Sequence, residues 1–96
     1  MSLSDPQRRH LRALAHDLKP VVLVGDKGVT ESLLRELDLS LAHHELLKVR
    51  VKAGDRDQRD ALVGRLCAAS GAELVQRIGH VAVLYRAAEP PRLKLP

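Results

Sequence analysis

The chain has 96 residues, 45% of them hydrophobic, which suffices for one domain with a single core and excludes a disordered chain. Its net charge of +4 favours a polyanionic partner, while the lack of Trp and Phe, with Tyr85 as the one aromatic residue, excludes modules that stack bases on several rings. No hydrophobic run reaches the ~20 residues of a membrane span, and residues 1–6 lack the apolar stretch of a signal peptide. The single cysteine, Cys67, cannot form an internal disulfide. We therefore expect a cytoplasmic protein without membrane contact.

A first helix is expected to begin after Ser4, because this polar cap precedes Pro6 in the first helical turn. The helix should end before Pro20, since the residue preceding a proline avoids helical geometry. Its predicted core stripe recurs at helical spacing and consists of Leu11, Leu14, Ala15 and Leu18. The next run, Val21–Val24, is short, apolar and rich in β-branched residues, which predicts a buried strand.

A glycine-bracketed loop, Gly25-Asp26-Lys27-Gly28, follows this strand and leads into a second predicted helix. Thr30 has the side chain of an N-cap residue and marks the expected start of that helix. The helix is expected to fade near His43 and His44. Its predicted core face consists of Leu33, Leu34, Leu37 and Leu41.

Residues 47–52 alternate between apolar and cationic side chains, which predicts a half-buried strand. A turn is expected at residues 53–54. Asp55, with Gln58 three residues later, has the pattern of a capping box for a third helix, and Gly71 is a natural stop for it. The predicted inner side of this helix consists of Ala61, Leu62, Leu66 and Ala69.

Two further strands, Glu73–Ile78 and Val81–Arg86, are separated only by Gly79-His80, which favours a tight hairpin. The tail, residues 89–96, is proline-rich and cationic, so we expect it to be extended beyond a single domain of residues 1–88. The order α-β-α-β-α-β-β predicts a compact α/β domain with a mixed four-stranded sheet and the second and third helices on one face. The strand order stays open, and the first helix is expected at an edge or end of the sheet.

The glycine loop has two interpretations. Gly25 and Gly28 allow a backbone to approach a phosphate closely, Lys27 supplies a positive charge, and the start of the next helix adds a favourable dipole. The same residues also suit a plain tight turn. Asp26 brings a negative charge to the loop, so we expect it either to cap its own loop or to contact a base or a ribose hydroxyl.

Basic residues elsewhere in the chain also have two interpretations. Lys48, Arg50 and Lys52 project from one face of their predicted strand about 7 Å apart, which is near the spacing of successive phosphates along a nucleic acid strand. An ordinary solvated sheet face explains them equally well. The arginines of the first helix, Arg12 among them, form either a binding surface or a solvated helix face.

The sequence contains no catalytic constellation, so we expect no enzyme activity and no small-molecule substrate. His43 and His44 are adjacent on a helix and point in different directions, and no third ligand has recognisable spacing, so we expect no metal site. The glycine loop lacks the patterns of nucleotide-binding loops, so no cofactor is expected. Cys67 lies near the core stripe of the third helix and is interpreted as a packing residue.

Several stretches follow one another from the first helix to the last strand: Leu14-Ala15-His16 with Leu18–Val22, Gly25–Gly28 with Thr30-Glu31, His43–Leu46 with Lys48-Val49, Ile78-Gly79, and Val83–Arg86. Together they resemble the CRM domain family (chloroplast RNA splicing and ribosome maturation), in its stand-alone bacterial YhbY type. The resemblance implies a compact α/β fold with a KH-like GxxG loop, binding of structured RNA, and association with precursors of the large ribosomal subunit. The expected RNA-binding residues are the loop and the basic residues around it: Arg12, Lys19, Gly25, Asp26, Lys27, Gly28, Lys48, Arg50, Lys52 and Arg86.

The resulting hypothesis is a monomeric RNA-binding protein that holds folded ribosomal RNA through its phosphate backbone and selects it by shape. One alternative is a module that binds DNA or nucleic acids in general. Another is a protein adaptor whose basic face and tail dock an acidic partner. The sequence leaves open which RNA segment is bound and at which assembly step.

Overall fold

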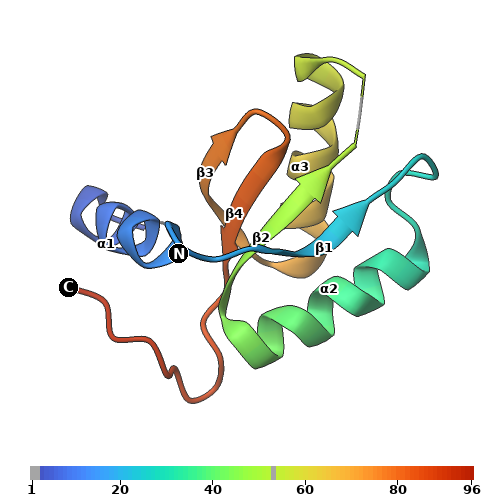
Figure 1. Ribbon diagram of the computed structural model, residues 1–96. Helices are drawn as coiled ribbons and strands as arrows, with labels where there is room; N and C mark the ends of the chain where they lie inside the picture. The colour runs from blue at the N-terminus through green and yellow to red at the C-terminus, as the bar shows by residue number, and fades with distance from the viewer. Residues whose placement is uncertain (1–2, 53) are drawn as a thin grey trace.

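The computed structural model describes residues 3–52 and 54–96, and its elements follow the predicted order (Figure 1). They are α1 (Asp5–Ala15), β1 (Pro20–Val24), α2 (Glu31–His44), β2 (Leu46–Val51), α3 (Arg56–Ser70), β3 (Glu73–Ile78) and β4 (Val81–Tyr85). Ser4, Thr30 and Asp55 cap the three helices as predicted, each accepting a hydrogen bond from a backbone N–H three residues later. Of the predicted turn at Ala53 and Gly54, Ala53 lies outside the described residues. None of the helices in the described residues has the length and hydrophobicity to cross a membrane.

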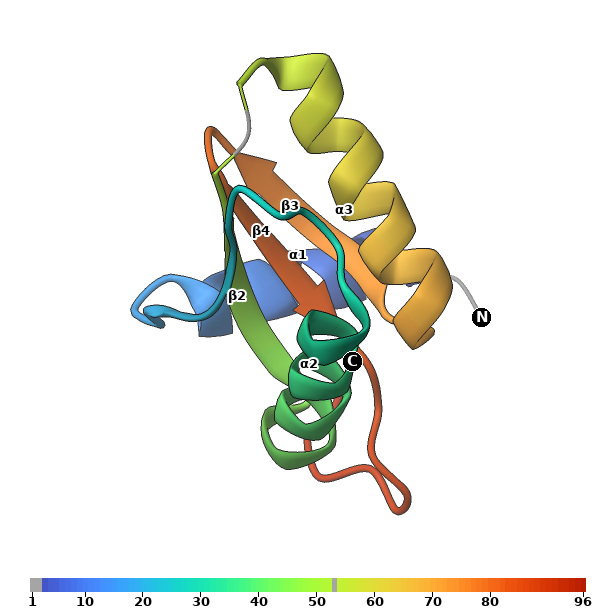
Figure 2. The same cartoon turned by 90° about the vertical axis from the view of Figure 1, so that its right-hand side faces the viewer.

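The four strands form one sheet in the order β1-β2-β4-β3, which the sequence left open. β1 runs parallel to β2, and β4 is antiparallel to both of its neighbours, so the sheet is mixed as predicted. Both α2 and α3 cover the same face of this sheet (Figure 2). The main core between them consists of Val22, Val24, Leu37, Leu41, Leu47, Val49, Val51, Val63, Leu66, Ala72, Ala82 and Leu84.

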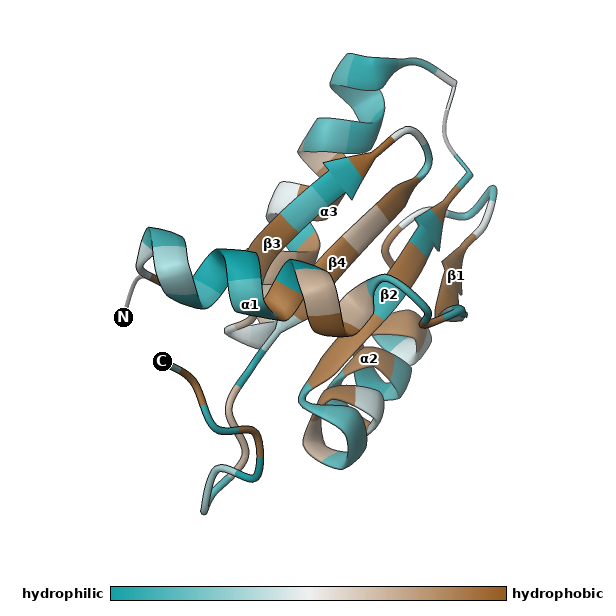
Figure 3. Cartoon of the chain, turned by 60° about the vertical axis from the view of Figure 1, so that its left-hand side comes forward, coloured by the Kyte–Doolittle hydropathy of each residue, from teal (hydrophilic) through white to brown (hydrophobic). Residues whose placement is uncertain are grey.

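α1 packs on the opposite face of the sheet, which corrects the expectation of a place at an edge or end (Figure 3). Leu11 and Ala15 of α1 are buried there. They pack against the side chains that the strands turn away from α2 and α3, namely Leu46, Val75, Val83 and Tyr85. Packing α1 on these apolar side chains removes their surface from water, which stabilises the fold by about 25 cal/mol per Å². The cover is partial, and Leu14, which was expected in the core, remains 43% exposed.

β1 differs from the buried strand that its sequence predicts. Val22 and Val24 are buried, but Val21 and Leu23 are 50% and 55% exposed. The reason is that β1 is an edge strand with helices on one face only, so its side chains alternate between core and solvent. A continuous apolar run in the sequence therefore does not by itself show that both faces of the strand are covered.

The inner side of α3 is also shifted from the predicted one. Val63 and Leu66 are buried in the core, with Leu62 partly buried against it, whereas Ala61 and Ala69 are exposed. The helix therefore faces the sheet with its larger branched side chains, which bury more apolar area than alanines do. Its capping box and its left-handed stop at Gly71, with φ at 75°, are confirmed.

The tail after β4 contains neither helix nor strand, and it folds back onto the domain. Leu93 and Leu95 pack against the cluster that includes Leu11 of α1. The Arg92 side chain donates hydrogen bonds to the carbonyl oxygens of Ala42 and His43 at the end of α2. The division into residues 1–88 and 89–96 stays a prediction.

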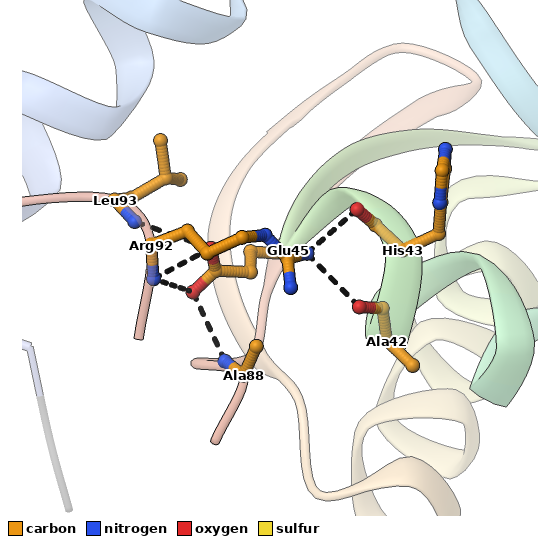
Figure 4. Close-up of polar contacts among 6 residues, drawn as sticks. All are labelled: Ala42, His43, Glu45, Ala88, Arg92 and Leu93. Atoms are coloured by element: carbon orange, nitrogen blue, oxygen red, sulfur yellow. Dashed lines mark hydrogen bonds and ion pairs between the residues drawn. The ribbon is translucent and has the colours of Figure 1, made fainter. Parts of the chain in front are cut away.

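Glu45 connects this tail to the sheet (Figure 4). Its carboxylate is 1% exposed and accepts hydrogen bonds from the backbone N–H groups of Ala88, Arg92 and Leu93 at 3.0 to 3.2 Å. Burial alone would raise the pKa of Glu45, but these donors and the charge of Arg92 outweigh it and hold the pKa below its ordinary value. Glu45 also has a positive φ of 62°, so the chain holds a non-glycine residue in a strained conformation at this junction.

Candidate nucleic-acid interface

The loop between β1 and α2 is closed by a hydrogen bond from the backbone N–H of Gly28 to the carbonyl of Gly25, at 3.0 Å. Gly28 has a φ of +71°, in the left-handed region that favours glycine. The side chain of Thr30 then accepts the N–H of Leu33 at 3.1 Å and starts α2. The sequence thus builds a turn whose shape depends on Gly28.

A groove of about 480 Å³ lies between this loop and α3, and we call it the loop groove. Its lining residues come from the loop, from the end of β2 and from α3: Gly25, Asp26, Gly28, Lys52, Gly54, Gln58, Ala61, Leu62 and Arg65. A Cβ at Gly28 would lie 4.0 Å from Cδ2 of Leu62, so the loop packs close to α3. The groove therefore has a backbone wall on one side and a helix wall on the other.

Two cations line the loop groove, Lys52 and Arg65. The backbone N–H of Lys52 donates to the carbonyl of Val24 at 2.9 Å, which fixes the end of β2 beside the loop. Lys27 is exposed at the loop tip. Three positive charges around a loop of this size can neutralise phosphates that approach the backbone of Gly28.

Two expectations about the loop need adjustment. The carboxylate of Asp26 is exposed and accepts no hydrogen bond from any described residue, so it does not cap its own loop. The start of α2 is already complemented by the Thr30 side chain and by the negative charge of Glu31. Cationic side chains therefore attract an anion here more strongly than the helix dipole does.

The remaining predicted site residues do not all gather at the loop groove. Lys19 is exposed just before β1, and Arg50 is exposed on the face of the sheet that α1 partly covers. Arg12 and Lys48 line a separate pocket on that same face. Lys52 follows the last residue of β2 and lines the loop groove, so Lys48, Arg50 and Lys52 do not form one row along a strand face.

Arg86 lies in a third place and is engaged within the protein. Its guanidinium donates to the carboxylate of Asp38 at 2.7 Å, to the carbonyl of Asp38 at 3.0 Å and to the carbonyl of Ser70 at 2.9 Å. These bonds connect α2 with the end of α3. The structure therefore gives Arg86 a part in holding the helices and does not bring it to the loop.

Gln58 and Arg65 line the loop groove but were not among the predicted site residues. They are seven positions apart on α3, with Ala61 and Leu62 between them, which places them on one helix face. That spacing is visible in the sequence. The position of this face beside the glycine loop is not, because it depends on the packing of α3 against the sheet.

The described residues contain no group of three or more His, Cys, Asp or Glu side chains that could hold a metal ion. Cys67 packs partly buried against the core, as expected, and burial together with the nearby Glu73 raises the pKa of its thiol. A raised pKa keeps the thiol protonated and unreactive at neutral pH.

Comparison with known proteins assigns the family. Residues 3–86 match the model of the CRS1 / YhbY (CRM) domain, which covers most of the chain. The chain belongs to this family. A Haemophilus influenzae CRM relative named as an RNA-binding protein is 42% identical over 95 residues, spanning 99% of this chain and 96% of its own. A Pseudomonas aeruginosa relative is also 42% identical over 95 residues, spanning 99% and 91%.

The CRM fold is also seen in a solved structure. The solution structure of a hypothetical Staphylococcus aureus protein, described as a candidate RNA-binding protein, has a TM-score of 0.85 and 36% sequence identity to this chain. The match covers 99% of this chain and 100% of that one. This confirms the predicted family and the α/β fold. The relatives are named for binding RNA and not for a reaction, in agreement with the expectation of a protein that is not an enzyme.

Proposed function

We propose that this CRM protein binds structured RNA at the loop groove, and that its target is ribosomal RNA in precursors of the large ribosomal subunit. The observation that carries the proposal is that the glycine loop forms one wall of a groove lined by two cations, Lys52 and Arg65, with Lys27 exposed on the same loop. The names of the relatives from Haemophilus influenzae and Staphylococcus aureus support RNA as the ligand. We expect the protein to act as a monomer in the cytoplasm.

The proposed mechanism is recognition of the phosphate backbone. Gly25 and Gly28 have no side chains, so a phosphate can approach the loop backbone closely at these two positions. Lys27, Lys52 and Arg65 neutralise phosphates and release counterions. With three such contacts, the affinity should fall by about 40-fold between 50 and 200 mM salt.

The direct test replaces Gly28 with Asp, which adds bulk and negative charge and strains the left-handed turn. The matched control is Gly64→Asp, because Gly64 is exposed on α3, has open space around it and does not line the groove. Binding to ribosomal RNA hairpins is measured by fluorescence anisotropy, and circular dichroism checks the fold. We expect Gly28→Asp to lose RNA binding and Gly64→Asp to keep it. Equal affinity of the two variants would refute the role of the loop.

The ribosomal role needs its own experiment. A cell lysate is sedimented through a sucrose gradient at low and at raised salt, and the native protein is detected in the fractions. We expect migration with particles slightly lighter than the mature large subunit, lost at raised salt. A protein that stays at the top of both gradients would refute this role.

Two competing functions are separated by simple controls. Preference for duplex DNA over structured RNA of equal charge would favour a general nucleic-acid module. An association that survives nuclease treatment would favour an adaptor for an acidic protein. Neither function has an observation of its own at the loop groove.

A further inference from the structure

α1 crosses only part of its face of the sheet, and we call the part that it leaves uncovered the open face (Figure 3). Apolar and cationic residues, Leu23, Arg50 and Ile78 among them, are exposed there. The strand register places Leu23, Arg50, Val81 and Ile78 side by side across all four strands. Leu23 and Ile78 are 55% and 63% exposed. Large hydrophobic side chains that lie exposed in one row, with charged residues among them, mark interaction surfaces.

A cavity of about 270 Å³ lies on the open face beside α1, and we call it the face pocket. Ile78, Val81 and Val83 supply its apolar lining, and Arg12, Lys48 and Gln76 supply polar groups. Its volume is slightly below the roughly 300–1,000 Å³ of ordinary small-molecule sites. This size suits a group such as one nucleobase.

The polar groups of the face pocket are free to bind an anion. None of the residues that line the pocket is acidic. The side chains of Arg12 and Gln76 form no hydrogen bond or ion pair with any described residue. Lys48 donates one hydrogen bond from Nζ, to the carbonyl of His16 at 3.3 Å, which leaves two of its three N–H groups available. The pocket thus combines an apolar lining with unpaired donors.

The open face meets the loop groove at the end of β2, where Arg50 and Lys52 are two residues apart. Lys52 lines the loop groove directly after the end of β2, and Arg50 and Lys48 precede it within β2, about 6.6 Å apart at strand geometry. Arg50 is exposed on the open face, and Lys48 lines the face pocket. A polyanion held at the loop groove can therefore follow these cations over the end of β2 onto the open face.

We propose that the face pocket receives one unpaired nucleotide of the RNA held at the loop groove, an inference that rests on the proposed function. The base contacts Ile78 and Val81, and its phosphate contacts Lys48. The guanidinium of Arg12 offers a flat surface for stacking, which serves where aromatic rings are lacking. The amide of Gln76 supplies a donor and an acceptor for a base edge. Arg12 and Lys48 make the pocket cationic, and its face meets the proposed RNA groove at the end of β2, so RNA is favoured over an acidic peptide as the occupant.

The test compares two RNA hairpins with the same stem, one blunt and one with a short single-stranded extension. Affinity is measured by anisotropy for the native protein and for Ile78→Ser, which shortens the apolar lining at an exposed position. Leu39→Ser is the matched control, because Leu39 is 71% exposed on α2, away from the pocket. The extension should tighten binding about tenfold for the native protein and for Leu39→Ser. Ile78→Ser should lose this gain and keep the affinity for the blunt hairpin.

Each other outcome has a defined meaning. Equal affinity of the native protein for both hairpins would refute nucleotide binding in the face pocket. It would leave RNA binding at the loop groove untouched, because the Gly28→Asp variant tests that role separately. No binding to either hairpin would overturn the proposed function itself. Nuclear magnetic resonance provides a second measurement with an unstructured oligonucleotide, which should shift the amide signals of Ile78 and Val81. Shifts there with an acidic peptide and not with the oligonucleotide would identify a protein partner and overturn the proposal.

Discussion

Replacing Glu45 with Gln tests how the tail is held to the domain. Gln has the same size, and both residues must adopt the positive φ of this position, so the change isolates the charge and one acceptor. In the native protein Oε2 accepts from Ala88 and Arg92, while Oε1 accepts from Arg92 and Leu93. An amide has a single accepting oxygen. In either orientation its NH2 group therefore faces backbone N–H donors.

The expected cost follows from these bonds. A hydrogen bond to a charged group contributes about 1.5–3 kcal/mol, and a buried donor left without a partner costs about 1–3 kcal/mol. Losing one charged bond and weakening the others should lower the free energy of unfolding by about 3 kcal/mol. In a domain of this size about 1 kcal/mol shifts Tm by 4–8 °C, so we expect Tm to fall by about 12–24 °C if tail and domain unfold together.

Thermal unfolding at pH 7, followed by circular dichroism, measures this change. Hydrogen exchange of the Ala88, Arg92 and Leu93 amides reports the tail alone, and these amides should lose protection. Glu89→Gln is the matched control, because Glu89 is exposed in the same tail, and it should change the stability by no more than about 0.5 kcal/mol. A variant with unchanged Tm and with all three amides still protected would refute this account of Glu45.

Three further predictions concern stability. Folding lowers the pKa of Glu45, so the stability that its carboxylate contributes is complete well above the ordinary value of 4.5 and is lost as the pH falls through the folded pKa. The Tm difference between the native protein and Glu45→Gln should therefore shrink towards pH 3. A difference that stays constant with pH would contradict this account. Arg86→Ala removes both bonds to Asp38 and should lower the free energy of unfolding by about 2 kcal/mol in urea, with Arg86→Lys intermediate; no change would show that these bonds add nothing. Thr30→Ala removes the acceptor of the Leu33 N–H and should cost about 1 kcal/mol, while Thr30→Ser should restore stability; equal loss in both variants would exclude the cap as the cause.

Local signals in the sequence predicted the secondary structure well. The caps at Ser4, Thr30 and Asp55 and the stop at Gly71 are confirmed, because each depends on residues within one helical turn. The order of elements follows from these starts and stops together with hydrophobic periodicity. The family resemblance was confirmed as well.

Features that depend on packing were not predictable in this way. The exposure of Leu23 follows from the edge position of β1, and the burial of Val63 in place of Ala61 follows from the rotation of α3 against the sheet. For the candidate site, the sequence named the glycine loop and Lys52 but not Arg65, because the meeting of α3 with the loop is a tertiary contact. Arg86 looked like a free cation since its partner Asp38 is 48 positions away.

The position of Glu45 has a consequence for the order in which the chain folds. Its partners Ala88, Arg92 and Leu93 lie 43 to 48 positions later, so they are synthesised after α3 and the rest of the sheet. Until they emerge, the Glu45 carboxylate must keep its water, because a bare buried charge would be too costly. The junction between α2 and β2 can therefore close only after all four strands have been synthesised, when the N–H groups of these later residues replace that water.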